Sequence, residues 1–251
     1  MVKIILIGAN GKMGSAITAT VEADKNCKII AGVDKYKGIE RSYPVYDSPK
    51  EITDEADVII DFSNPEALSD VLVFAKAQKI GLVIGTTGLS DEQTEAINEA
   101  SEAIPIFSSF NMSLGVNLLV ELSKKAAAVL GDSFDIEIIE KHHNQKIDAP
   151  SGTAFMLANA INETLDNSMI YEYDRHSKRE KRREKEIGIH SVRGGNIVGE
   201  HEVIFAGNDE IITLSHSARS KALFATGAVN AAKFLAGKIP GIYSMKHLID
   251  A

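Results

Sequence analysis

Short apolar runs recur along the first 112 residues, and segments with helical periodicity separate them. A continuous apolar run of a few residues, bounded by turn residues, is typical of a strand buried on both faces of a parallel sheet. Such runs occur at 3–7, 28–33, 58–61, 82–84 and 105–107. The alternation of these runs with helical segments predicts an α/β region, Rossmann-like, with a parallel sheet.

The pattern changes after residue 113. A long helix is predicted from Leu114 to about Leu130, and a strand at 135–139 alternates polar with β-branched residues before a second helix opens at Phe155. Residues 162–173 are predicted to be irregular. Consecutive strands with short turns then predict an α+β region with an open, largely antiparallel sheet. These strands are expected at 187–193, 201–205 and 210–216, and a last helix at 222–236.

Composition narrows the class of protein. The chain has 251 residues, of which 44% are hydrophobic and 25% charged, as in ordinary globular proteins. A net charge of -8 argues against nucleic acid as a partner. The lone Cys27 excludes an internal disulfide, and with no signal peptide or apolar membrane span in the sequence we expect a cytoplasmic protein.

A glycine-rich turn follows the first strand and precedes a helix, which is the context of a dinucleotide-binding site. Its spacing is Gly-x-x-Gly-x-x-Gly instead of the commoner Gly-x-Gly-x-x-Gly. A P-loop is excluded because Met13, and not Ser or Thr, follows Lys12. The predicted cofactor-binding residues of this turn are Gly8, Ala9, Asn10, Gly11, Lys12, Met13 and Gly14.

The second strand ends at Asp34, roughly 20 residues after Gly14, the separation at which an acidic residue binds ribose hydroxyls. An acid here favours NAD, whereas Lys35 and Lys37 offer positive charge for a 2′-phosphate. The choice between NADH and NADPH therefore stays open. The alternative to a cofactor role for these residues is a solvated turn at the end of the strand. We assign Asp34 and Lys35 to the cofactor site.

Further loops follow the other strands of the predicted parallel sheet, at the edge where nucleotides bind. These are Phe62–Pro65, Gly85–Gly88 and Ser108–Met112. Each one alone could be an ordinary turn. Because they lie on one edge of one sheet, we predict that together they form a cofactor cleft.

The segment between the strand at 135–139 and the helix after it has the highest concentration of candidate catalytic residues in the chain. His142, His143 and Lys146 precede Pro150, which fits the first turn of a helix. The backbone and hydroxyl groups of Ser151, Gly152 and Thr153 then suit a small carboxylate at the helix N-terminus. The adjacent histidines lack further ligands at zinc spacing, so no metal site is predicted. The alternative is a polar surface loop.

The run Glu137–Ala154 resembles the signature of dihydrodipicolinate reductase, the NAD(P)H-dependent enzyme of lysine (diaminopimelate) biosynthesis. The resemblance implies two domains, with 1–112 and 222–251 binding the dinucleotide and 113–221 binding a cyclic dicarboxylate substrate. It implies proton donation by His142, with Lys146 assisting. His143, Ser151, Gly152 and Thr153 would bind substrate carboxylates. Phe62, Gly85, Thr86, Thr87, Ser109, Phe110, Asn111 and Met112 would lie around the nicotinamide.

The resemblance extends over nearly the whole chain and implies a homotetramer formed through the second sheet. The segment Ser191–His201 also matches the family, and we interpret it as mainly structural because its glycines serve turns. At Lys221 the family often has Arg, and Lys lacks the bidentate fork. We therefore do not assign Lys221 to the substrate site.

The run Arg175–Glu186 holds seven Lys or Arg against three Glu. A solvated face is the expectation, and a loop that attracts an anionic substrate is the alternative.

Two other functions remain possible interpretations of the whole chain. One is another two-domain amino-acid dehydrogenase, which would oxidise aspartate or homoserine. The other is a dinucleotide sensor without turnover, whose basic loop contacts a partner.

Overall fold

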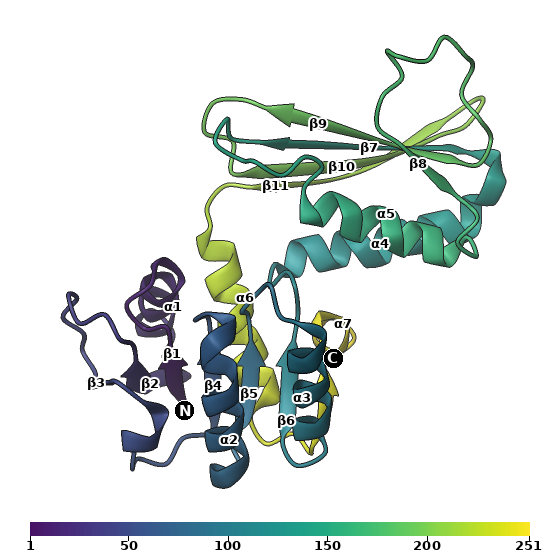
Figure 1. The fold of residues 1–251 in the computed structure, drawn as a ribbon. Coiled ribbons are helices and arrows are strands. Elements are labelled where there is room, and N and C mark those ends of the chain that lie inside the picture. Colours follow the sequence, from purple (N-terminus) through teal and green to yellow (C-terminus); the bar gives the residue numbers. More distant parts are fainter. The chain divides into compact units, whose positions relative to one another are not determined.

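The computed structural model describes residues 1–251, apart from the side chain of Asp132. The chain forms two compact units, one comprising Met1–Leu114 with Ala222–Ala251 and the other Gly115–Lys221 (Figure 1). The sequence analysis placed the first boundary two residues earlier and the second at the same position.

The first unit contains a seven-stranded sheet in which every pair of neighbours is parallel. The strand order is β12-β6-β5-β4-β1-β2-β3, so the chain begins near the middle and winds outward in both directions. This confirms the predicted Rossmann-like arrangement. The strands are β1 (Val2–Ile7), β2 (Cys27–Val33), β3 (Val45–Tyr46), β4 (Val58–Asp61), β5 (Gly81–Ile84), β6 (Pro105–Ser108) and β12 (Gly241–Tyr243).

Helices cover both faces of this sheet, which explains the continuous apolar runs. Along β1, Ile4 and Leu6 pack toward α1 and α6, whereas Ile5 and Ile7 pack toward α2 and α3. The last long helix is thus part of the first unit. The helices are α1 (Lys12–Glu22), α2 (Leu68–Gln78), α3 (Asp91–Ser101), α6 (Ala222–Leu235) and α7 (Met245–Ile249), with short 3-10 turns η1 (Pro49–Glu51) and η2 (Pro65–Ala67).

The second unit contains a five-stranded sheet of order β11-β10-β7-β9-β8. Its pairings are mixed, because β7–β9 and β8–β9 are parallel while β10 is antiparallel to both β7 and β11. The expectation that consecutive strands are neighbours holds for β10–β11 and is wrong for β9–β10, which β7 separates. The strands are β7 (Asp135–His142), β8 (Ile170–Glu172), β9 (Glu186–Arg193), β10 (Gly199–Ala206) and β11 (Ile211–Ala218).

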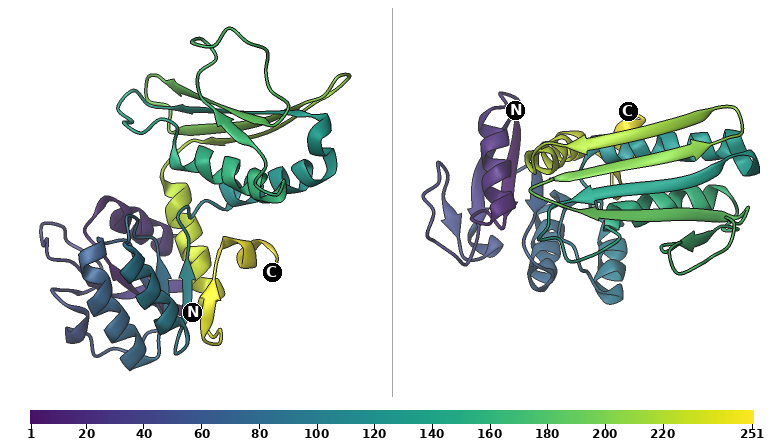
Figure 2. Two further views of the ribbon diagram at one scale, coloured as in Figure 1. Left: turned by 45° about the vertical axis from the view of Figure 1, so that its right-hand side comes forward. Right: turned by 90° about the horizontal axis from the view of Figure 1, so that it is seen from above.

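Two helices, α4 (Leu114–Leu130) and α5 (Gly152–Thr164), lie along one face of the second sheet, and a 3-10 turn, η3 (Gly131–Ser133), follows α4 (Figure 2). Ile138, Ile189 and Val203 point toward them and form the core of this unit with Leu157 and Ile161. We call the face toward the helices the inner face and the opposite one the outer face. The right view of Figure 2 looks onto the outer face, which carries no helix of the described chain.

Two local predictions of the second unit are wrong. Pro150 does not lie in the first turn of α5, because Ser151 is the N-cap and Pro150 precedes it after a cis peptide bond. Residues 162–173 are not irregular, since α5 continues to Thr164 and β8 forms at Ile170–Glu172. The short strand was missed because three residues give too little periodicity.

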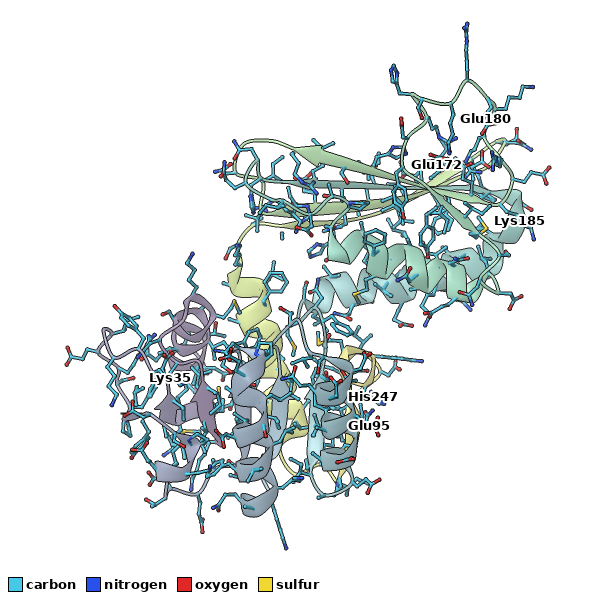
Figure 3. All side chains as sticks on the ribbon, viewed as in Figure 1. Lys35, Glu95, Glu172, Glu180, Lys185 and His247 are labelled. Carbon is cyan, nitrogen blue, oxygen red and sulfur yellow. The ribbon has the colours of Figure 1, made fainter. Side chains whose placement is uncertain are left out.

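The basic run forms most of the β8–β9 loop (residues 173–185), and part of it is pinned to the sheet. Arg182 donates to Asp135 Oδ1 at 2.7 Å and to Glu137 Oε1 at 3.1 Å, and Arg175 pairs with Glu137 and Glu186. Glu180 and Lys185, labelled in Figure 3, are exposed. The expected solvated face therefore describes only some of these residues.

Candidate active site

The glycine-rich turn of the first unit is held so closely that two of its glycines are obligatory. Gly8 has φ +78°, and a Cβ there would lie 2.7 Å from the carbonyl oxygen of Phe62. A Cβ on Gly14 would lie 2.2 Å from the Gly8 oxygen. Strand β1, the turn and α1 therefore pack as the sequence motif predicts.

Asp34 ties the end of β2 to this turn. Its Oδ2 accepts a hydrogen bond from Asn10 N at 2.9 Å, and its Oδ1 accepts one from Tyr36 N at 2.8 Å. Arg41, which the sequence analysis missed, donates to Ala9 O at 2.6 Å and to Ser15 Oγ at 2.8 Å. No motif indicates Arg41, because it lies in an irregular segment far from the turn in sequence.

Two cavities lie at the carboxyl edge of the parallel sheet, and the loop after β4 lines both. The first, of about 380 Å³, is bordered by Gly8, Gly11, Asp34, Lys35 and Phe62. The second, of about 400 Å³, is bordered by Met13, Phe62, Gly85, Thr86, Thr87, Ser109, Phe110, Asn111, Met112 and Phe224. The structure thus brings the predicted loops together around Phe62. Ala9, Asn10, Lys12 and Gly14 are part of the turn but do not border either cavity.

The loop after β4 is anchored by Asp61, which is fully buried at the end of the strand. Its Oδ1 accepts hydrogen bonds from the backbone N and the hydroxyl of Ser63 at 2.9 and 2.6 Å. Burial raises the pKa of Asp61, and the Ser63 bonds offset only part of this effect. This carboxyl group fixes the loop that carries Phe62.

The inner face of the second sheet changes from apolar to polar toward the start of α5. One row across the strands is Ile138, Ile189, Val203 and Leu214, and the row two residues further along consists of Glu140, Ser191, His201 and His216. Alternation along each strand puts both rows on the same face. A patch of titratable side chains therefore continues the hydrophobic core.

Glu140 lies at the centre of this patch and has no solvent exposure. Its Oε2 lies 2.6 Å from His142 Nδ1, and its Oε1 accepts a hydrogen bond from Ser151 N at 3.1 Å. Arg193, on the neighbouring strand β9, donates to both carboxylate oxygens, at 2.8 and 2.7 Å. The carboxylate is thus paired with a cation and hydrogen-bonded on both oxygens, as a buried charge requires.

These contacts set the protonation of the patch. Burial opposes the charge of Glu140, but the bonds from Arg193 and His142 outweigh it and lower its pKa to about 2. Burial lowers the pKa of His142, although the Glu140 bond counteracts part of the effect. Burial, with the nearby His142, lowers the pKa of His201 to about 4, and burial also lowers the pKa of His216.

Ser151 joins this patch to the start of α5. Its hydroxyl accepts a hydrogen bond from Ala154 N at 3.2 Å, which is the usual N-cap contact, and lies 3.0 Å from His201 Nε2. Because Ser151 N donates to Glu140 and its hydroxyl contacts Ala154 and His201, the polar groups of Ser151 already have partners within the protein. Gly152, which is exposed, and Thr153 form the accessible part of the predicted anion site.

The loop between β7 and α5 carries the remaining predicted residues. Lys146 Nζ forms an ion pair with Asp148 Oδ1 at 2.8 Å, and its backbone N donates to His143 O at 3.1 Å. His143 and Lys146 are partly exposed, whereas His142 is only 9% exposed. Lys221, which was not assigned to the substrate site, is exposed at the end of the second unit.

The interpretation of Ser191–His201 as mainly structural stays a prediction, but two residues of this segment contact the patch directly. Arg193 holds Glu140, and the His201 ring contacts that of His142 edge-to-face at 5.2 Å. Strand register was the missing signal, because β9 and β10 both pair with β7.

Among the described residues no group of three His, Cys, Asp or Glu is arranged to hold a metal. None of the described helices has the length and apolar character needed to span a membrane.

Comparison with known proteins covers both units. The family profile for the N-terminus of dihydrodipicolinate reductase matches residues 2–112, and that for the C-terminus matches 115–249. A 4-hydroxy-tetrahydrodipicolinate reductase of Caldanaerobacter subterraneus subsp. tengcongensis is 53% identical over 99% of this chain and 98% of the relative.

Two solved structures have the same fold as this chain. The dipicolinate-bound dihydrodipicolinate reductase of Paenisporosarcina sp. TG-14 superposes with a TM-score of 0.83 at 27% identity, over 97% of both chains. The diaminopimelate dehydrogenase of C. glutamicum shares the fold, with a TM-score of 0.58 at 11% identity over 99% of this chain and 95% of the other. The resemblance seen in the sequence is confirmed, and the chain belongs to the dihydrodipicolinate reductase family.

Proposed function

We propose that this chain catalyses the NAD(P)H-dependent reduction of 4-hydroxy-tetrahydrodipicolinate to tetrahydrodipicolinate, the activity named for its relatives. The observation that carries the proposal is the cluster of His142, Lys146 and the α5 start at one end of the second unit, in a chain that matches the family over its full length. This cluster offers a proton donor and groups that bind carboxylates, as a cyclic dicarboxylate requires.

The first unit fits a dinucleotide. Gly8 and Gly14 leave a turn that a Cβ would fill, and the N-terminus of α1 favours a pyrophosphate. The cavity at Asp34 and Lys35 suits the adenosine half. The cavity at Gly85–Thr87 and Ser109–Met112 suits the nicotinamide half. When bound, the cofactor supplies a hydride.

Cofactor choice follows from the two charges in the first cavity. The Asp34 carboxylate favours the free ribose hydroxyls of NADH, whereas Lys35 borders the same cavity and favours the 2′-phosphate of NADPH. Since both side chains line one space, we propose that the enzyme accepts both cofactors.

The chemistry requires one proton for each hydride. Loss of water from the substrate leaves a ring with a conjugated double bond, and a hydride adds to one end of that bond while a proton adds to the other. His142 is the proposed proton donor. Burial lowers the pKa of His142 and therefore favours the neutral ring. The Glu140 carboxylate stabilises the imidazolium form, which donates the proton.

Lys146, His143, Gly152 and Thr153 are the proposed carboxylate-binding groups. Without substrate the Lys146 ammonium pairs with Asp148, which is exposed, so a substrate carboxylate can take over this contact at little cost. The Gly152 and Thr153 amides lie in the first turn of α5, where an anion is stabilised by the helix dipole.

We also propose a homotetramer built on the outer face of the second sheet, in the cytoplasm. The outer face carries half-buried Ile139 and Ile204, and Val192 is 44% exposed there. The same face also carries charged side chains, such as the Lys141–Glu200 pair. A sheet face of mixed apolar and charged residues with no covering helix is a suitable contact for a second copy. Sedimentation should give four times the 27.1 kDa chain mass, and Val192→Glu should yield smaller species.

Oxidation of NADH and NADPH at 340 nm, with enzymatically generated substrate, tests the activity. His142→Gln and Lys146→Ala should each lower kcat/KM by about 10²–10⁴-fold while cofactor affinity is unchanged. His176→Gln and Lys125→Ala, both at exposed positions, are the matched controls.

Two rival functions give different results. An amino-acid dehydrogenase, whose fold this chain shares at low identity, would oxidise aspartate or homoserine. A dinucleotide sensor would bind the cofactor without any turnover. Normal cofactor binding with no reduction of the substrate by the wild type would reject the reductase function.

A further inference from the structure

A single carboxylate contacts both parts of the proposed substrate site. Oε2 of Glu140 lies against the His142 ring, and Oε1 holds Ser151 N, the N-cap of α5. Arg193 closes the arrangement from β9 with a bidentate pair to Glu140 and a further bond from Nη2 to Asp148 O at 2.6 Å. The proton donor and the helix start therefore share one anchor.

The anchor decides which ring nitrogen of His142 carries hydrogen. With two donor nitrogens of Arg193 and the Ser151 amide directed at it, Glu140 is ionised and can only accept hydrogen bonds. At 2.6 Å from Oε2, Nδ1 of His142 must then be the donor. In the neutral ring this leaves Nε2 without hydrogen.

The opposite nitrogen has space around it because residue 199 is a glycine. A Cβ on Gly199, in β10, would lie 3.1 Å from His142 Nε2 and 3.5 Å from its Cδ2. Contact at that distance is tighter than side chains normally make. Glu140 thus holds one edge of the ring, and Gly199 leaves room at the opposite edge.

We propose that Glu140 is a positioning residue that fixes His142 as the Nδ1–H tautomer, so that Nε2 is the nitrogen that takes up and gives the transferred proton, and that Arg193 holds Glu140 in this role. The inference deepens the proposed function and rests on it for the identity of the proton donor. Glu140 itself does not touch the substrate. It acts through His142, in the way that carboxylates orient imidazoles in other sites.

The tautomer can be measured without any turnover. Long-range ¹H–¹⁵N spectra of the full-length protein labelled with ¹⁵N-histidine distinguish a protonated from an unprotonated ring nitrogen, and the His142 signals are those missing in His142→Gln. We expect Nδ1 protonated and Nε2 unprotonated in the wild type at neutral pH. Glu140→Gln should move hydrogen to Nε2, because an amide NH₂ in place of Oε2 requires Nδ1 to accept. A wild-type ring protonated on Nε2 would overturn the proposal.

Kinetics then test whether the tautomer matters. Glu140→Gln should lower kcat by at least about tenfold, the lower range for losing a group that orients an active residue, with the cofactor Kd unchanged. Glu140→Asp, which keeps the acceptor, should recover part of the loss, and Glu163→Gln on the exposed side of α5 should match the wild type. Unchanged kcat in Glu140→Gln would overturn the positioning role, even with the tautomer altered. A wild type without turnover would reject the proposed function, while the spectra would still decide the tautomer.

Discussion

Arg193 and Glu140 form a bidentate ion pair across the parallel strands β9 and β7, with N–O distances of 2.8 and 2.7 Å. Glu140 has no solvent exposure, so the pair is largely removed from water. A buried carboxylate that loses its cation becomes an uncompensated charge. The stability of this end of the sheet and the state of the His142 ring therefore depend on the same contact.

The first prediction concerns stability in acid. The pKa of Glu140 is about 2 in the fold against an ordinary value of 4.5, so its stabilisation is complete above pH 4.5 and is lost as the pH falls toward 2. This shift corresponds to about 3 kcal/mol. Between pH 5 and 2, the free energy of unfolding of Glu140→Gln should fall by about that much less than in the wild type, measured by urea denaturation. Parallel curves for the two proteins would contradict the assigned pKa.

The second prediction uses Gly199, the glycine beside the Nε2 edge of the His142 ring. Gly199→Ala adds a methyl group 3.1 Å from Nε2 and should displace the ring, lowering kcat by up to about 10²-fold, the scale for a catalytic group misplaced by about 1 Å. Gly194→Ala is a matched control, because no atom lies within 4 Å of a Cβ at that position. Equal kcat for both variants would mean that the ring has room to shift. Stopped-flow measurement of a single turnover separates this step from product release.

The first unit could be predicted in detail because its signals are local. Five of its strands are short apolar runs, and the glycine turn and Asp34 are defined by their distance from these runs in the sequence. Alternate residues of β1 then pack on opposite faces, as expected for a sheet between two helix layers. The bounds of β1, β2, β4, β5 and β6 differ from the prediction by at most one residue at either end, whereas the short strands β3 and β12 were missed.

The second unit was harder because its site depends on register. Glu140, His201 and His216 are far apart in sequence and come into one row only because β10 lies between β7 and β11. Nothing local shows that β7 separates β9 from β10, so the sequence analysis did not connect Arg193 with Glu140. Similarly, the ion pairs of Arg182 with Asp135 and Glu137 could not be read from a charge run.

The third prediction concerns cofactor binding. A Cβ on Gly85 would lie 2.2 Å from the Phe62 ring, which borders both cavities of the first unit. Gly85→Ala should push this ring aside and weaken NADH binding by about tenfold, or about 1.4 kcal/mol. Fluorescence titration measures the Kd. In the double variant Gly85→Ala/Phe62→Ala the clash is removed. Phe62→Ala should therefore weaken NADH binding less in the Gly85→Ala background than in the wild type. Additive effects of the two substitutions on the Kd would contradict this account.

The last prediction concerns the β8–β9 loop. Arg182 is only 17% exposed and connects the loop to β7 through Asp135 and Glu137, whereas Arg183 is 60% exposed and pairs with Glu180 within the loop. Replacing Arg182 by Met leaves Glu137 with fewer cationic partners and frees the loop from the sheet. Limited trypsin digestion should therefore cut the loop faster at Lys178, Arg179 and Lys181 in Arg182→Met. Arg183→Met removes one cleavage site in the same way but should leave the rate at the other sites as in the wild type. If both variants are cut at equal rates, the loop is held by contacts other than Arg182.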